Sequence, residues 1–124
     1  MKVTFTETEY KILARAAERM IRARRAFTSN EWNKPANKAI KAFSKKFGNV
    51  AHFDGNYHEV HLDRNLLRLI QDVCRMQQEA LEHSVIPEYV ARGLQGLRTA
   101  EYHAKAVRLA ADCAAMVAKV EALL

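Results

Sequence analysis

The sequence predicts a mainly α protein, a compact bundle of four to five helices with a small β-hairpin inserted between the second and third helices. Three observations predict this class. Long segments repeat apolar residues at helical spacing, one short segment has a hairpin turn between apolar runs, and only four glycines and two prolines occur among 124 residues. Because 49% of the residues are apolar, a packed core can form without metals or disulfides, and we expect a single domain over residues 1–124.

The first helix begins with a strong local signal. Thr6 and Glu9 have the spacing of a capping box, and Phe5 precedes the cap where it can pack on Tyr10. The apolar spacing predicts a helix from about Glu7 to Phe27. Its polar side collects four cations, Lys11, Arg15, Arg19 and Arg22.

The second helix is the most clearly amphipathic segment. Residues 28–33 are rich in turn formers, contain the only tryptophan, Trp32, and predict a connection. Pro35 suits a first helical turn and Gly48 a stop. Opposite the apolar side, one stripe of this helix and its start carries Lys34, Lys38, Lys41 and Lys45.

A β-hairpin is predicted over residues 50–62, because Asp54-Gly55 is flanked by short apolar runs. The segment around Val3 and Phe5 can add a third short strand. Asp63 then caps a third helix that we expect to end near His83.

The C-terminal part is helical and rich in alanine. Pro87 can open a helical stretch, Gly93 and Gly96 weaken it, and a long helix runs from about Arg98; whether residues 87–124 form one helix or two stays open. This last helix has a bulky apolar side and a smooth alanine side, so it is expected to be buried on most sides. Either it is the central helix of the bundle, or the alanine side joins two copies in a homodimer.

The positive charge is concentrated in the first half. Residues 1–62 hold 12 Lys/Arg and 6 Asp/Glu, whereas residues 63–124 hold 8 of each. The chain thus divides into a basic helical half at about 1–49, the hairpin, and a neutral helical half at 63–124. Within residues 10–50 the ratio is 11 to 2, which favours a polyanionic partner and excludes an acidic mimic of nucleic acid.

The favoured function is therefore binding, with nucleic acid as the first candidate partner. Phosphate-neutralising cations lie on two successive helices, and an aromatic side chain that could stack on a base lies between them. The alternative is an inhibitor or regulator that docks the same face on an acidic protein surface or in the nucleic-acid channel of a larger complex. Both hypotheses use Lys11, Arg15, Arg19, Arg22, Trp32, Lys34, Lys38, Lys41 and Lys45.

One enzyme hypothesis rests on six residues of the last helix. The segment from Arg98 to His103 resembles the Arg-x4-His pattern of the helical HEPN ribonucleases. The resemblance implies a dimeric nuclease in which Arg98 and His103 of each subunit act on RNA.

Metal and cofactor chemistry have little support in the sequence. His52, Glu59 and His61 can share one side of the hairpin but spread along a strand, and we expect no cofactor. Cys74 and Cys113 fall on apolar helix sides and are expected to be reduced core residues. Because no stretch has the apolar length of a membrane span and the N-terminus lacks a signal-peptide core, we expect no membrane partner and a cytoplasmic location.

Overall fold

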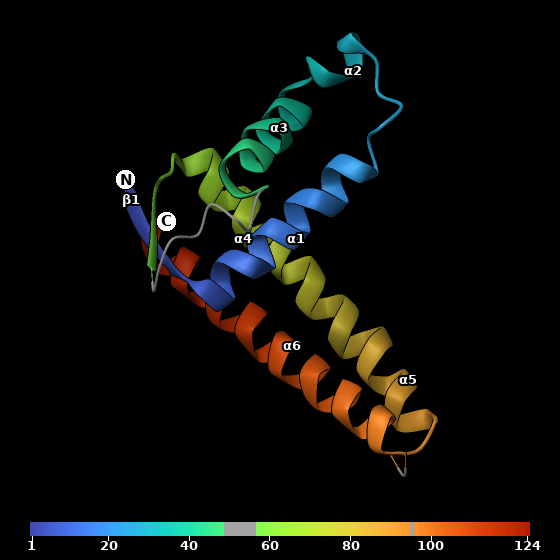
Figure 1. Cartoon of the computed structure of the whole chain (residues 1–124). Coiled ribbons are helices and arrows are strands. Elements are labelled where there is room, and N and C mark those ends of the chain that lie inside the picture. The colour runs from blue at the N-terminus through green and yellow to red at the C-terminus, as the bar shows by residue number, and fades with distance from the viewer. Residues whose placement is uncertain (49–56, 95) are drawn as a thin grey trace. The chain divides into compact units, whose positions relative to one another are not determined.

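The computed structural model describes residues 1–48, 57–94 and 96–124 and confirms the predicted fold class, mainly helical with a small antiparallel sheet (Figure 1). The contacts divide the chain into two compact units, Met1–Leu69 and Ile70–Leu124. The prediction of a single domain stays a prediction, and each unit is described by itself.

The sheet of the first unit joins the two strands β1 (Lys2–Thr6) and β2 (Tyr57–His61). They pair antiparallel, with Val3 opposite Val60, and both of these side chains are buried. The predicted short strand near the N-terminus is thus confirmed, as is the strand at the end of the predicted hairpin. The Asp54-Gly55 turn and the strand expected before it lie outside the described residues.

Helix α1 (Glu7–Arg22) begins as predicted but ends earlier. Glu9 N–H donates to the Thr6 hydroxyl and Thr6 N–H donates to the Glu9 carboxylate, which completes the capping box. The expected extension to Phe27 is wrong. The Arg24 guanidinium turns back and donates to the Met20 carbonyl at 2.9 Å, so the last turn is closed by a side chain before the chain bends away.

Helix α3 (Pro35–Phe47) has its predicted bounds, and it lies beside α1 (Figure 1). The connection between them contains one helical turn, α2 (Ser29–Trp32), capped by Thr28. Four aromatic rings hold α3 in the core. Phe47 is fully buried, with ring centroids 5.7 Å from Phe5, 5.8 Å from Tyr10 and 5.0 Å from Phe43.

Helix α4 (Arg64–Ala80) begins at the predicted cap, where Leu66 N–H donates to the Asp63 carboxylate at 2.8 Å. The predicted end near His83 is wrong. The helical path continues through a π-helical segment, η2 (Leu81–Val85), into α5 (Ile86–Ala91). Ile86 N–H donates to the Leu81 carbonyl five residues back; this wider turn comes directly before Pro87, which has no N–H to continue an α-helical ladder.

The second unit pairs this helical path with α6 (Leu97–Leu123). Residues 87–124 therefore form two helices, separated where Gly93 adopts a φ of 82°. One buried cluster of this unit consists of Leu81, Ala106 and Ala110, with four half-buried neighbours, Val85, Ile86, Tyr89 and Leu109.

The exposure of α6 differs from the expected burial on most sides. Cys113, Met116 and Val120 of the bulky side are buried, but Tyr102 is 45% exposed. On the alanine side, Ala104, Ala111 and Ala118 are exposed. Neither the central-helix nor the homodimer alternative is decided by these exposures.

Candidate nucleic-acid interface

The predicted cations lie on the outer sides of α1 and α3, within the first unit. Apolar residues occupy the inner sides, including Leu13 and Ala17 of α1 and Ile40 of α3, all buried. Helical periodicity therefore turns the basic residues outward. All eight predicted cations are exposed: Lys11, Arg15, Arg19, Arg22, Lys34, Lys38, Lys41 and Lys45.

Two of these cations are neutralised within α1. The Lys11 ammonium lies 3.0 Å from the Glu7 carboxylate. The Arg22 guanidinium forms an ion pair with the Glu18 carboxylate. The remaining carboxylates of residues 1–48 act at helix starts, Glu9 as described and Glu31 as an acceptor from the Thr28 hydroxyl.

The other six predicted cations form no ion pair within the described part of the chain: Arg15, Arg19, Lys34, Lys38, Lys41 and Lys45. The carboxylates of residues 1–48 are thus used in local pairs and caps. The lysines of α3 face solvent, and α3 itself contains no acidic residue. Lys38 lines a further hollow together with Asp63, but no described ion pair joins them. Such a face attracts anions most strongly at low salt.

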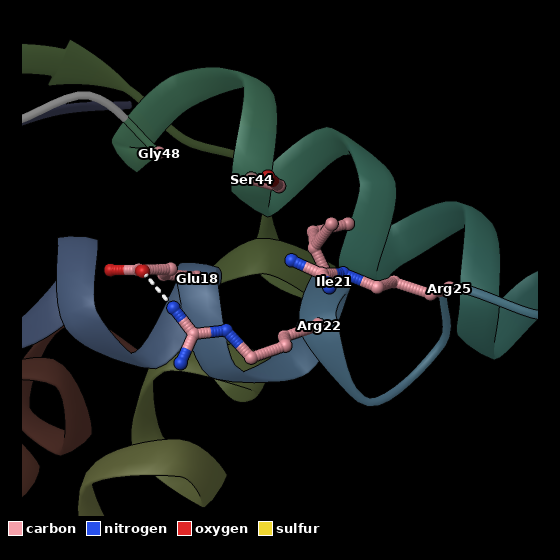
Figure 2. A pocket seen from close by; sticks show the side chains of 6 residues that line it. All are labelled: Glu18, Ile21, Arg22, Arg25, Ser44 and Gly48. Carbon is pink, nitrogen blue, oxygen red and sulfur yellow. Dashed lines mark hydrogen bonds and ion pairs between the residues drawn. The ribbon is translucent and has the colours of Figure 1, made fainter.

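A groove lies between the C-terminal part of α1 and α3, and we call it the α1–α3 groove. It consists of two adjoining hollows of about 220 and 450 Å³ that share Ile21 and Ser44. The first is also lined by Glu18, Arg22, Arg25 and Gly48 (Figure 2), and the second by Lys38, Lys41, Ala42 and Lys45. Both hollows combine the apolar Ile21 with cationic side chains, whose charged ends can stay in water and contact a phosphate there.

The groove adds one cation that the predicted site omits. Arg25 follows the end of α1, and Figure 2 shows its side chain reaching back along Ile21, whereas Arg22 turns to Glu18. Arg25 forms no ion pair with a described carboxylate. The local excess of basic residues contained the signal, but the end of α1 decides where this side chain points.

Trp32 lies in α2, the short helix that connects α1 to α3 (Figure 1). It lines neither hollow. Its ring is half-buried and packs on Phe27, with ring centroids 5.7 Å apart and the planes tilted by 60°. The structure therefore places the tryptophan beyond one end of the cationic groove.

The weaker candidate sites, for a metal and for RNA cleavage, stay predictions. Glu59 and His61 lie on exposed positions of β2, His52 is outside the described residues, and no group of three His, Cys, Asp or Glu side chains suited to a metal occurs in the part of the chain described. Arg98 is exposed and His103 half-buried on α6. Five residues apart, they point about 140° from each other around the helix axis. Cleavage of RNA without a metal ion, lost in the variant His103→Ala, would confirm the HEPN-like activity.

The two cysteines are free and buried, as expected. Burial, and to a lesser extent the neighbouring Asp112 carboxylate, raises the pKa of the Cys113 thiol to about 11. This cysteine is therefore a protonated core residue at neutral pH and a poor nucleophile.

Comparison with known proteins identifies no relative: no protein-family model, curated protein or solved structure matches the chain. Among the described helices, none is both long enough and apolar enough to cross a membrane.

Proposed function

We propose that this protein binds polyanions, with nucleic acid as the natural partner, through the α1–α3 groove and the cations beside it. One observation carries the proposal. Arg25, Lys38, Lys41 and Lys45 converge on a groove between two packed helices without a described carboxylate partner. A solvated helical face normally mixes both signs of charge, so an unneutralised cluster is better explained by a partner that supplies the anions.

The test is the binding of a labelled oligonucleotide to the purified protein, followed by fluorescence anisotropy between about 50 and 200 mM salt. We expect affinity to fall steeply with salt, because each neutralised phosphate releases a counterion. Replacing Lys38, Lys41 and Lys45 by Gln should weaken binding about tenfold or more and reduce the slope of log K against log salt by about 2 to 3.

A matched control removes the same charge elsewhere. The variant Arg68→Gln, Arg75→Gln, Arg108→Gln also loses three exposed cations, but from α4 and α6. We expect it to retain most of the affinity. Equal losses in the two triple variants would show that net charge, rather than this surface, attracts the oligonucleotide.

The competing hypothesis, docking of the same face on an acidic protein, predicts a different salt response. A protein interface organised around a buried aromatic or apolar anchor persists as salt rises. Absence of oligonucleotide binding at the lowest salt would therefore reject the nucleic-acid proposal.

A further inference from the structure

The connection between α1 and α3 contains an aromatic platform formed by the rings of Phe27 and Trp32. Phe27 N–H donates to the Arg24 carbonyl at 3.1 Å, and the Arg24 guanidinium lies 5.8 Å from the centre of the Phe27 ring. The Asn37 amide donates to the Glu31 carbonyl at 2.7 Å, which ties α3 to α2. The Trp32 ring rests on Phe27. These contacts tie the segment that carries the indole to α3 and to the residues after α1.

The Trp32 side chain keeps access to solvent although tryptophan is a costly residue to leave exposed. It is half-buried, and its indole N–H donates to no described residue. Because no fully buried side-chain nitrogen or oxygen of the described residues lacks a partner, this N–H reaches solvent. At least the polar edge of the indole is therefore accessible to a ligand.

The platform lies beyond one end of the α1–α3 groove, at the end where the lysine stripe of α3 begins. Lys34 is the cap residue of α3, two positions after Trp32, and Lys38, Lys41 and Lys45 follow along the same helix. From Lys34 to Lys45 the helix rises by about 17 Å, at 1.5 Å per residue. That length corresponds to about five phosphates of a stacked strand at 3.4 Å per nucleotide.

We propose that Trp32 stacks on an unpaired base, so that the polyanion bound by the groove is a single-stranded nucleic acid. This inference rests on the proposed function and deepens it. Cations that follow the phosphate backbone and an aromatic ring that accepts a base are the two components of single-strand binding, and the stacking tolerates any sequence because every base has a π-face. A duplex keeps its bases stacked inside and offers the platform none.

Trp32 supplies its own reporter, because it is the only tryptophan of the chain. The protein is titrated at low salt with three probes: a 12-nucleotide oligo-dT strand, a 12-base-pair duplex and inorganic polyphosphate. We expect oligo-dT to quench the Trp32 emission over the same concentration range in which anisotropy detects binding. Polyphosphate should bind and displace labelled oligo-dT while leaving the emission nearly unchanged, because it has no base.

Substitution separates the stacking from the charge. Trp32→Ala should weaken oligo-dT binding about 5- to 150-fold, the worth of one stacked base, and leave polyphosphate binding as it is. Trp32→Phe keeps a ring and should recover most of the affinity. Far-UV circular dichroism of both variants checks that the helices persist.

The outcomes distinguish this inference from the proposed function. If polyphosphate binds but Trp32→Ala leaves the preference for oligo-dT over polyphosphate unchanged, the stacking proposal is overturned while the polyanion surface stands. A duplex that binds as tightly as oligo-dT and quenches Trp32 equally also overturns it. If none of the probes binds, both proposals fall.

Discussion

The stability of the first unit should depend on one aromatic side chain, Phe47. Its ring is 0% exposed and packs against the rings of Phe5, Tyr10 and Phe43, which belong to β1, α1 and α3. Replacing a buried phenylalanine by alanine costs about 3 to 5 kcal/mol, from lost transfer free energy and the cavity that remains. For a ring with three aromatic contacts we expect a loss in the middle of that range, about 4 kcal/mol.

The measurement is urea unfolding, followed by circular dichroism and by Trp32 fluorescence, which reports on the same unit. Phe47→Leu keeps most of the volume and should lose about 1.5 kcal/mol. Val90→Ala, at a side chain 54% exposed on α5, should change the free energy of unfolding by about 0.5 kcal/mol or less. A loss below about 1 kcal/mol for Phe47→Ala would refute the view that this ring cluster holds α3 in place.

Three further predictions concern local contacts. Glu18→Gln removes the only carboxylate among the described residues that line the α1–α3 groove and releases Arg22, so oligonucleotide affinity should rise about 3-fold at low salt, whereas Glu79→Gln on α4 should change it little. Thr6→Ala breaks the capping box and should lower the free energy of unfolding by about 1 kcal/mol, with Thr6→Ser near wild type; equal values for the two would contradict the assigned cap. Because the pKa of Cys113 is about 11 in the fold and ordinarily 9.0, its contribution to stability is present below pH 9 and lost as the pH rises from 9 to 11. Between pH 9 and 11 the free energy of unfolding, measured by urea titration, should fall less in Cys113→Ala than in the wild type. An equal fall in both proteins would show that Cys113 is not its cause.

Helix ends that are fixed by capping residues close in the sequence were predictable. Thr6 with Glu9, and Asp63, satisfy backbone N–H groups within three residues of themselves. Pro35 has no N–H to leave unpaired in the first turn of α3, and Gly48 N–H donates to the Ser44 carbonyl at its end. These effects do not depend on the rest of the fold. This explains why both bounds of α3 and the starts of α1 and α4 agree with expectation.

Ends determined by more distant or unusual contacts were not predictable. The apolar periodicity of α1 continues to Phe27, but the helix ends at Arg22, and the ring of Phe27 packs on Trp32 in the next turn. At η2 a proline normally predicts a break, yet a π turn lets the helical path continue. Whether a helix ends or continues at such a position is decided by tertiary packing rather than by the helix propensity of its residues.

Some features of the candidate site were likewise predictable from the sequence, and others were not. The outward direction of each predicted cation follows from helical periodicity, and the structure agrees for all eight. The pairing of Arg22 with Glu18, the placement of Arg25 in the groove and the distance of Trp32 from the groove depend on where α1 ends and how α3 returns. The sequence therefore indicates that a basic face exists, but the shape of that face can be known only from the folded structure.

The lysines of α3 carry a cost that supports a binding role. Lys34 with Lys38, and Lys41 with Lys45, are like charges at i,i+4, and each such pair destabilises a helix by about 0.2 to 0.5 kcal/mol. No acidic residue of the helix offsets this repulsion, and Lys34 at its start opposes the helix dipole. A bound phosphate backbone would remove the repulsion, so the cost is expected only in the free protein.

The variant Lys38→Gln, Lys41→Gln, Lys45→Gln should therefore be slightly more stable than the wild type, by about 0.5 kcal/mol at low salt, although it binds oligonucleotide more weakly. The gain should disappear near 1 M salt, where charges are screened within about 3 Å. Urea unfolding at the two salt concentrations measures it. A triple variant that is less stable at low salt would show that these lysines stabilise the fold through contacts of their own, and the argument that their charges serve a partner would fail.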